Sequence, residues 1–300
     1  MSDALAEVNE LLLQGASPEQ RELFMLSALD DYLLDAEGDE RRRREAIGAR
    51  PDDTLEPFIP RRGEGLALSA SDIETYRLCP LKYKFARVFR IPEEPSINQR
   101  FGIAVHQVLE RYHATGGGSL ERLMELFEAA WRRAGFGDSN DDVQFRQRAV
   151  EALKRYWELD RERDAEPVSF ERSFSFRLGP HILRGRVDRV DRLPDGSHEL
   201  IDYKTGKAKT ARELREDVQL SLYQMGAREA WGLDTAAQSY YYVLDNRKVP
   251  VEHSEEELER VRGTVAEIAD GIQAHRFDPK PSYELCSFCD YRIVCPAAEK

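Results

Sequence analysis

The segment "HILRGRVDRVDRLPDGSHELIDYKTG" (181–206) constrains the fold more than any other part of the sequence. Polar and apolar residues alternate on both sides of "PDG", which is typical of two β-strands joined by a hairpin turn. Antiparallel pairing brings side chains on one face together, so we expect Asp188 and Asp202 to lie close to each other. Lys204 follows Asp202 by two positions and points to the same face. Asp191 falls on the other face, where we expect it to meet solvent.

Two carboxylates held together repel each other, and a bound cation relieves that repulsion. Oxygen ligands favour a hard cation such as Mg²⁺, with Mn²⁺ as the alternative. The backbone carbonyl of Tyr203 is a candidate additional ligand. Lys204 is placed to hold a water beside the cation, or to offset charge in a transition state. The same spacing also allows a plainer arrangement, in which the aspartates are solvated and Asp202 forms an exposed ion pair with Lys204.

Two helical segments carry further candidate residues. His106 in "FGIAVHQVLE" offers an imidazole to the same cation. Gln219 and Tyr223 in "QLSLYQ" are four positions apart, so they share one helical face and both can donate hydrogen bonds to a phosphate. Each has a structural alternative: a histidine packed against its neighbours, or polar residues on an ordinary helix surface.

Three of the four cysteines lie within ten residues near the end of the sequence; the set is Cys79, Cys286, Cys289 and Cys295. The first residues show no signal-peptide pattern, so we expect a cytoplasmic chain without disulfides. The clustering indicates Zn²⁺ or an iron–sulfur cluster, and spacing does not choose between them. Zinc ribbons usually use two local cysteine pairs, whereas only one is present here. Four unrelated reduced cysteines are the alternative.

Charge and composition divide the chain into three parts. Residues 1–46 are predicted to be an acidic helical extension, 47–65 a linker rich in Pro, Gly and charge, and 66–300 the main domain. The first 60 residues hold 15 acidic and 6 basic residues, so they carry most of the net charge of −12 that argues against a nucleic-acid partner. Helices precede a short mixed sheet with helices between its strands, which predicts an α/β domain. The sequence contains no apolar run long enough to span a membrane.

Four motifs in order, "FGIAVH", "GRVDRVD", "IDYKTG" and "QLSLY", resemble those of the PD-(D/E)XK nuclease superfamily in its RecB-like exonuclease branch. The resemblance covers about residues 66–300 and implies a restriction-endonuclease-like core. It implies that the metal ligands are His106, Asp188 and Asp202, that Lys204 is the catalytic lysine, and that Gln219 and Tyr223 are active-site residues. Val187 stands where the superfamily name has proline, as is common in RecB-like members.

The cysteine pattern resembles that of the AddB-type iron–sulfur nucleases of this superfamily, which place one cysteine before the nuclease motifs and C-x2-C-x5-C after them. "TYRLCPLKYKF" is similar to their first-cysteine segment. The resemblance implies a [4Fe–4S] cluster that staples the two ends of the domain together. The basic residues after Cys79 are expected either to face a DNA backbone or to form a solvated surface; they are Lys82, Lys84, Arg87 and Arg90.

The expected function is a metal-dependent deoxyribonuclease, an exonuclease acting on single-stranded DNA ends in recombinational repair. The chain lacks a "GxxxxGK[ST]" loop and so has no ATPase motor of its own. A helicase is the expected partner, and residues 1–60 are expected either to dock on a separate helicase or to be the remnant of one. One alternative is a catalytically inactive nuclease-fold subunit that binds DNA or serves as a scaffold in a helicase–nuclease complex. Another is a zinc-bound nucleic-acid module without catalysis.

Overall fold

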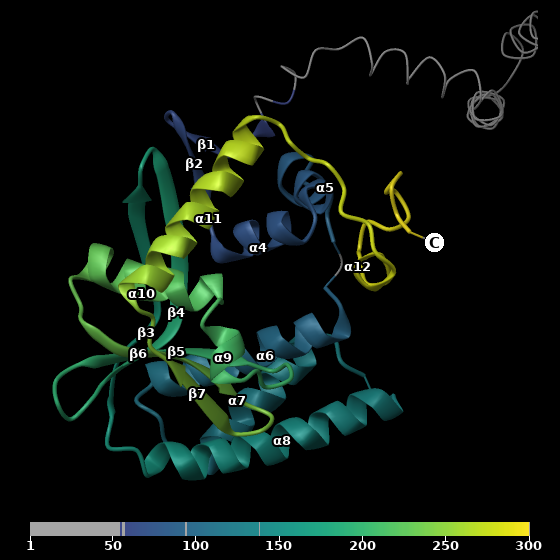
Figure 1. Ribbon diagram of the computed structural model, residues 1–300. Helices are drawn as coiled ribbons and strands as arrows, with labels where there is room; N and C mark the ends of the chain where they lie inside the picture. The colour runs from purple at the N-terminus through teal and green to yellow at the C-terminus, as the bar shows by residue number, and fades with distance from the viewer. Residues whose placement is uncertain (1–54, 56–57, 94, 138, 300) are drawn as a thin grey trace, which may run out of the picture. The chain divides into compact units, whose positions relative to one another are not determined.

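The computed structural model describes residue 55 and residues 58–299 except 94 and 138 (Figure 1). The predicted helical extension 1–46 therefore lies outside the described residues, as does most of the predicted linker 47–65. The end of that linker contains strand β1 (Arg61–Arg62) and the first residue of β2 (Gly65–Leu68). Within the described part, no helix combines the length and apolar composition needed to cross a membrane.

A mixed sheet is flanked by helices, as the sequence predicts for an α/β fold. The remaining strands are β3 (Glu166–Leu178), β4 (His181–Arg192), β5 (His198–Lys204), β6 (Thr235–Tyr242) and β7 (Arg247–Val251). The helices are α4 (Ala70–Leu78), α5 (Pro80–Tyr83), α6 (Ile97–Ala114), α7 (Leu120–Arg133), α8 (Asn140–Arg161), α9 (Ala211–Leu214), α10 (Val218–Trp231), α11 (Glu255–Gln273) and α12 (Tyr283–Ser287), with a π-helical turn after α5 (Lys84–Val88).

The strands follow the order β1-β2-β4-β5-β6-β7, and β3 pairs with β4. The β4/β5 hairpin is antiparallel, as predicted from the alternation around "PDG". The pairs β2/β4 and β5/β6 are parallel, whereas β3/β4 and β6/β7 are antiparallel.

Strand β4 changes partner partway along its length. It pairs with β2 through Ile182 and Leu183 and with β5 from Arg189 to Arg192. In the described part of the chain, residues 184–188 pair with neither β2 nor β5, and of these residues 184–187 pair with β3. The sheet is therefore open at this point, and the side chains and backbone of β4 are accessible to other groups there.

Helices cover both faces of the sheet (Figure 1). One face packs against α6, α7 and α8 in a core that includes Ile201, Tyr203 and Tyr241. Helix α10 contacts β3, β4 and β6, with α4 and α11 beside it. Because side chains alternate along β5, Ile201 and Tyr203 point to the first layer while Asp202 contacts α10.

Helix α10 approaches the sheet closely because glycines face Phe174 from two sides. A Cβ atom added to Gly185 on β4 or to Gly226 on α10 would lie 2.4 Å from a ring atom of Phe174. Any larger residue at either position would push the helix and the sheet apart. The packing of one phenylalanine against two glycines therefore fixes the distance between α10 and β4.

A buried arginine joins the sheet to α8 on the face away from α10. Arg189 is 1% exposed and forms ion pairs with Asp191 (2.5 Å) and Asp160 (2.6 Å). Its Nη1 donates to Tyr156 Oη (3.2 Å), which lies 2.8 Å from the hydroxyl of Tyr203. The prediction that Asp191 meets solvent is wrong: it is 1% exposed, because α8 and Arg189 cover the face to which its position assigns it.

Candidate active site

The open edge of β4 is held by groups from β5 and α10. The backbone N–H of Tyr203 donates to Asp188 Oδ2 (2.8 Å), so a side chain takes the place of the next strand pair. The hydroxyl of Tyr223 lies 2.8 Å from the carbonyl oxygen of Arg186. The last β4/β5 pair is Arg189 with Ile201, and one further step in register sets Asp188 opposite Asp202. Both aspartates thus lie where the two strands separate.

Asp202 is 2% exposed and accepts hydrogen bonds from α10. Its Oδ1 lies 2.9 Å from Gln219 Nε2 and 2.6 Å from the Tyr223 hydroxyl. Lys204 Nζ lies 2.7 Å from Asp202 Oδ2 and also donates to Gln219 Oε1 (2.9 Å). The structure therefore brings the predicted residues of β5 and α10 into one connected cluster beside Asp188.

His106 reaches the same cluster from α6. Its Nδ1 lies 3.1 Å from Asp188 Oδ2. Burial opposes protonation of the imidazole, but the hydrogen bond and charge of Asp188 outweigh burial and raise the pKa of His106. Its ring also meets the ring of Tyr203 edge-on, with the ring centroids 6.3 Å apart.

Asp202 is a buried carboxylate that keeps one oxygen without a hydrogen bond. Burial raises the pKa of Asp202; Lys204 opposes the shift and Asp188 adds to it. Burial alone would lower the pKa of Lys204, but the attraction of Asp202 raises it. Asp202 Oδ2 is buried and has no hydrogen bond of acceptable geometry, although Lys204 is near. Asp202 thus has Lys204 as its counter-charge and Asp188 has His106 as its partner, while one buried oxygen of Asp202 has an acceptor site to spare.

This donor set fits a divalent cation such as Mg²⁺. Within the described residues, no three His, Cys, Asp or Glu side chains converge closely enough to hold a metal ion by themselves. Mg²⁺ is usually bound through only one or two carboxylates and keeps several waters. The Tyr203 side chain is buried against Tyr156 and Tyr241, so only its backbone is available to this site.

One acidic residue at this place, Glu171 on β3, was not predicted from the sequence. It falls between the pairs Phe170–Arg189 and Arg172–Val187, so it lies opposite Asp188. Its backbone φ is +48°, and its Oε2 lies 2.6 Å from Arg186 Nε. Burial raises the pKa of Glu171, and the charge of Asp188 adds to the shift. The sequences "FERSFSF" and "GRVDRV" both alternate as strands do. If their register is known, that alternation predicts that Glu171 lies opposite Asp188.

Two cavities adjoin the cluster. The first, of about 500 Å³, is lined by Lys204, Gln219 and Tyr223 among others. The second, of about 690 Å³, is lined by His106 and Glu171. Arg186 lines both, so the two cavities meet at the open edge of β4.

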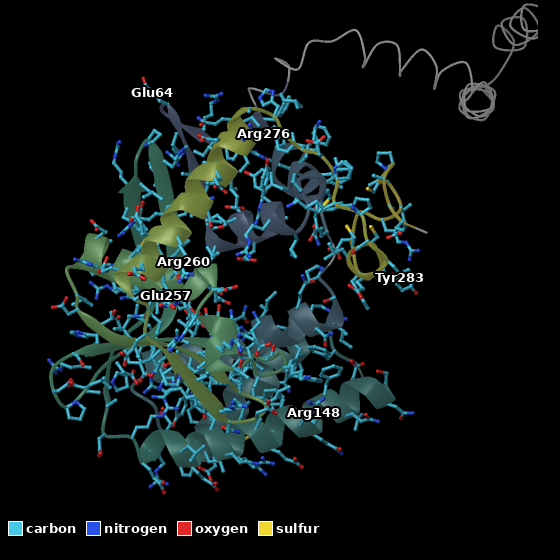
Figure 2. The ribbon with its side chains drawn as sticks, viewed as in Figure 1. Glu64, Arg148, Glu257, Arg260, Arg276 and Tyr283 are labelled. Carbon is cyan, nitrogen blue, oxygen red and sulfur yellow. The ribbon has the colours of Figure 1, made fainter. Side chains whose placement is uncertain are left out.

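All four cysteines line a third cavity, of about 300 Å³, although Cys79 precedes the other three by more than 200 positions. Figure 2 shows sulfur atoms gathered between α5 and α12. The thiols are free, and the ion pair between Lys82 and Asp290 (3.0 Å) also joins the two segments. Thiolates are ligands that iron–sulfur clusters and zinc prefer, but within the described residues the four thiols do not converge closely enough to form a metal site by themselves.

The basic residues after Cys79 bind mainly to this protein itself. Lys82 pairs with Asp290, and Arg87 pairs with Asp72 (2.5 Å). Lys84 Nζ lies 5.3 Å from the centroid of the Phe89 ring. These three residues therefore stabilise the cysteine-bearing segments, and the structure gives no support to a DNA-facing surface built from them.

Comparison with known families agrees with this geometry. The model of the PD-(D/E)XK nuclease superfamily matches residues 67–296, which is well over half of the chain. The chain belongs to this superfamily. Among similar proteins are the Gene 69 proteins of Mycobacterium phage D29 (26% identity, 76% of this chain, 96% of the relative) and Mycobacterium phage L5 (23% identity, 76% of this chain, 95% of the relative). Similar solved structures include a crystal structure from Eubacterium rectale (13% identity, TM-score 0.49, 78% of this chain, 90% of that chain).

The positive φ of Glu171 predicts a difference between two substitutions that both remove its charge. A left-handed backbone costs an L-residue about 1 kcal/mol more than glycine, so Glu171→Gly should be more stable than Glu171→Ala by about that amount. Urea unfolding measures the difference. At Ser173, an ordinary strand position, the order should reverse because glycine weakens a strand. An alanine variant at 171 as stable as the glycine variant would contradict the strained backbone.

Proposed function

We propose that the chain is a metal-dependent deoxyribonuclease of the RecB-like branch that degrades single-stranded DNA from its ends. The observation that carries this proposal is the connected cluster of Asp188, Asp202 and Lys204 at the open edge of β4. Nothing in ordinary sheet packing requires two carboxylates and a lysine at a gap in strand pairing. The completeness of the cluster also favours a catalyst over an inactive scaffold.

The reaction is hydrolysis of a phosphodiester. The oxygen of a water molecule bonds to phosphorus, the bond from phosphorus to one sugar oxygen breaks, and that oxygen takes a proton. The products are a phosphate monoester and a hydroxyl group. When bound, Mg²⁺ or Mn²⁺ supplies Lewis-acid activation of water and offsets phosphoryl charge; His106, Asp188, Asp202 and the Tyr203 carbonyl are the proposed ligands.

The other residues supply positive charge to the site and hold its groups in position. The attraction of Asp202 raises the pKa of Lys204, so its ammonium stays charged and stabilises negative charge that develops on the phosphoryl oxygens. Gln219 bridges the two: its Oε1 accepts a hydrogen bond from Lys204 Nζ, and its Nε2 donates one to Asp202 Oδ1. Tyr223 links Asp202 to the backbone of β4. Glu171 is a further acidic group facing Asp188, and we propose that it orients the water or a second cation.

We also propose that the four cysteines hold a [4Fe–4S] cluster; zinc is the alternative, and metal analysis of the purified protein would distinguish the two. The cluster would join the α4–α5 segment to the end of the chain. Closing so long a loop restricts the unfolded chain, and cluster binding then contributes to folding stability. The cysteines lie in a separate cavity from the aspartates, so the proposed role is structural.

A helicase on a separate chain is the proposed partner, in recombinational DNA repair. The chain has no phosphate-binding loop of its own to drive strand separation. Residues 1–46, with the linker 47–65, are the proposed tether to that partner because their acidic charge differs from that of the nearly neutral remainder.

Catalysis by the group of Asp188, Asp202 and Lys204 predicts the behaviour of two variants. Asp188→Ala and Lys204→Ala should each lower the cleavage rate by at least about 100-fold, as is typical for loss of a group that stabilises the transition state. The assay uses end-labelled single-stranded and double-stranded DNA with Mg²⁺ or Mn²⁺ under anaerobic conditions. Asp195→Ala, in the exposed hairpin turn, is the control and should cleave as wild type does. Full activity in both site variants would contradict the assignment of Asp188 and Lys204 to the active site.

The proposed [4Fe–4S] cluster predicts iron and sulfide in anaerobically purified protein. Cys79→Ala should lose both and melt at a lower temperature, while Mg²⁺ binding at Asp188 and Asp202 survives in the folded fraction. Iron, sulfide and Tm are measured on the same samples. Stoichiometric zinc without sulfide in wild type would refute the cluster, and an unchanged Tm in an iron-free variant would refute its structural role.

A further inference from the structure

The two cavities that meet at the candidate active site carry opposite charge. The first is lined by five cations against two acids, Glu74 and Asp217; the cations are Arg184, Arg186, Lys204, Lys207 and Lys209. The second is lined by three acids and one cation, Arg186; the acids are Glu93, Glu110 and Glu171. The border between the two charges lies at Arg186, two residues before Asp188.

The unpaired charges are distributed in the same way. In the first cavity Lys204 pairs with Asp202, Lys209 with Asp217 (3.6 Å) and Arg186 with Glu171. Among the residues that the structure describes, Arg184 and Lys207 have no ion-pair partner within 4 Å, and both are exposed. They are the cations of this cavity that are available to a ligand.

The second cavity presents negative charge instead. Glu171 is neutralised by Arg186, but within the described part of the chain neither Glu93 nor Glu110 forms an ion pair; Glu93 is hydrogen-bonded to Tyr291 and lies in the field of Lys82. Each nucleotide of a DNA strand carries one negative phosphate. A strand that extends through both cavities therefore gains attraction on one side of the aspartates and meets repulsion on the other.

We infer that the site binds its strand asymmetrically: phosphates of the retained strand lie against Arg184 and Lys207, and the released end leaves past Glu93 and Glu110. This inference rests on the proposed function and specifies how that site holds its substrate. Repulsion on the release side limits how many nucleotides extend beyond the bond that is cut. Cleavage consequently takes place near an end and gives short products, which do not remain bound.

The retained-strand side is tested by binding. Arg184→Gln/Lys207→Gln is compared with Arg148→Gln/Lys154→Gln, a pair of exposed cations on α8 outside both cavities (Arg148 is labelled in Figure 2). Anisotropy of a fluorescein-labelled single strand is measured across NaCl concentrations without divalent metal. Each lost phosphate contact lowers the slope of log affinity against log salt by about 0.7, so the cavity pair should lose about 1.4 and the control nothing.

The release side is tested by product length. Glu93→Gln/Glu110→Gln is compared with Glu229→Gln/Glu267→Gln, two exposed acids outside both cavities. Products released from an end-labelled single strand in Mg²⁺ are resolved by length. The first pair should give longer products than wild type, and the control pair should match wild type.

The outcomes separate this inference from the proposed function. If wild type cleaves no DNA with Mg²⁺ or Mn²⁺, the proposed function fails and the inference falls with it. If wild type cleaves DNA but the cation pair keeps the wild-type salt slope, or the acid pair keeps the wild-type product length, the asymmetric binding alone is overturned.

Discussion

The break in pairing along one edge of β4 is the constraint on which the rest of the site depends. A buried strand edge must satisfy its backbone groups, because each unpaired group loses its hydrogen bonds to water. Here the Tyr223 hydroxyl reaches the Arg186 carbonyl, and Asp188 accepts from the Tyr203 N–H. The groups that close the gap are therefore the groups of the candidate site. Phe174, packed between Gly185 and Gly226, holds α10 close enough for this to happen.

The two faces of β5 have different roles: one supports the structure and the other carries the candidate site. On one face Tyr203 joins Tyr156, Arg189 and two aspartates in a buried network of hydrogen bonds and ion pairs, which makes a rigid support. On the other face Asp202 is buried with only Lys204 as counter-charge, and burial raises its pKa. The buried Asp202 Oδ2 accepts no hydrogen bond of acceptable geometry, and it lies on the face that adjoins the two cavities. A cation bound there would gain a carboxylate oxygen that has an acceptor site to spare.

The alternation of side chains along a strand, here called strand parity, was sufficient to predict which residues share a face. It set Asp188, Asp202 and Lys204 together, and helical spacing did the same for Gln219 and Tyr223. Parity does not say what covers a face, so it could not show that α8 and Arg189 bury Asp191. Glu171 was missed because its place opposite Asp188 depends on the register of β3, which no local pattern fixes. The meeting of Cys79 with the distant C-terminal cysteines depends on the tertiary fold, and only the family resemblance predicted it.

The central claim is that the open edge of β4 binds a divalent cation between the two aspartates. Anomalous diffraction from crystals soaked in Mn²⁺ tests it most directly, because the scattering locates the ion without reference to activity. The claim predicts a manganese peak in contact with Asp188 and Asp202 and with the carbonyl oxygen of Tyr203. A well-ordered site without manganese density there, while manganese binds elsewhere on the protein, would contradict it.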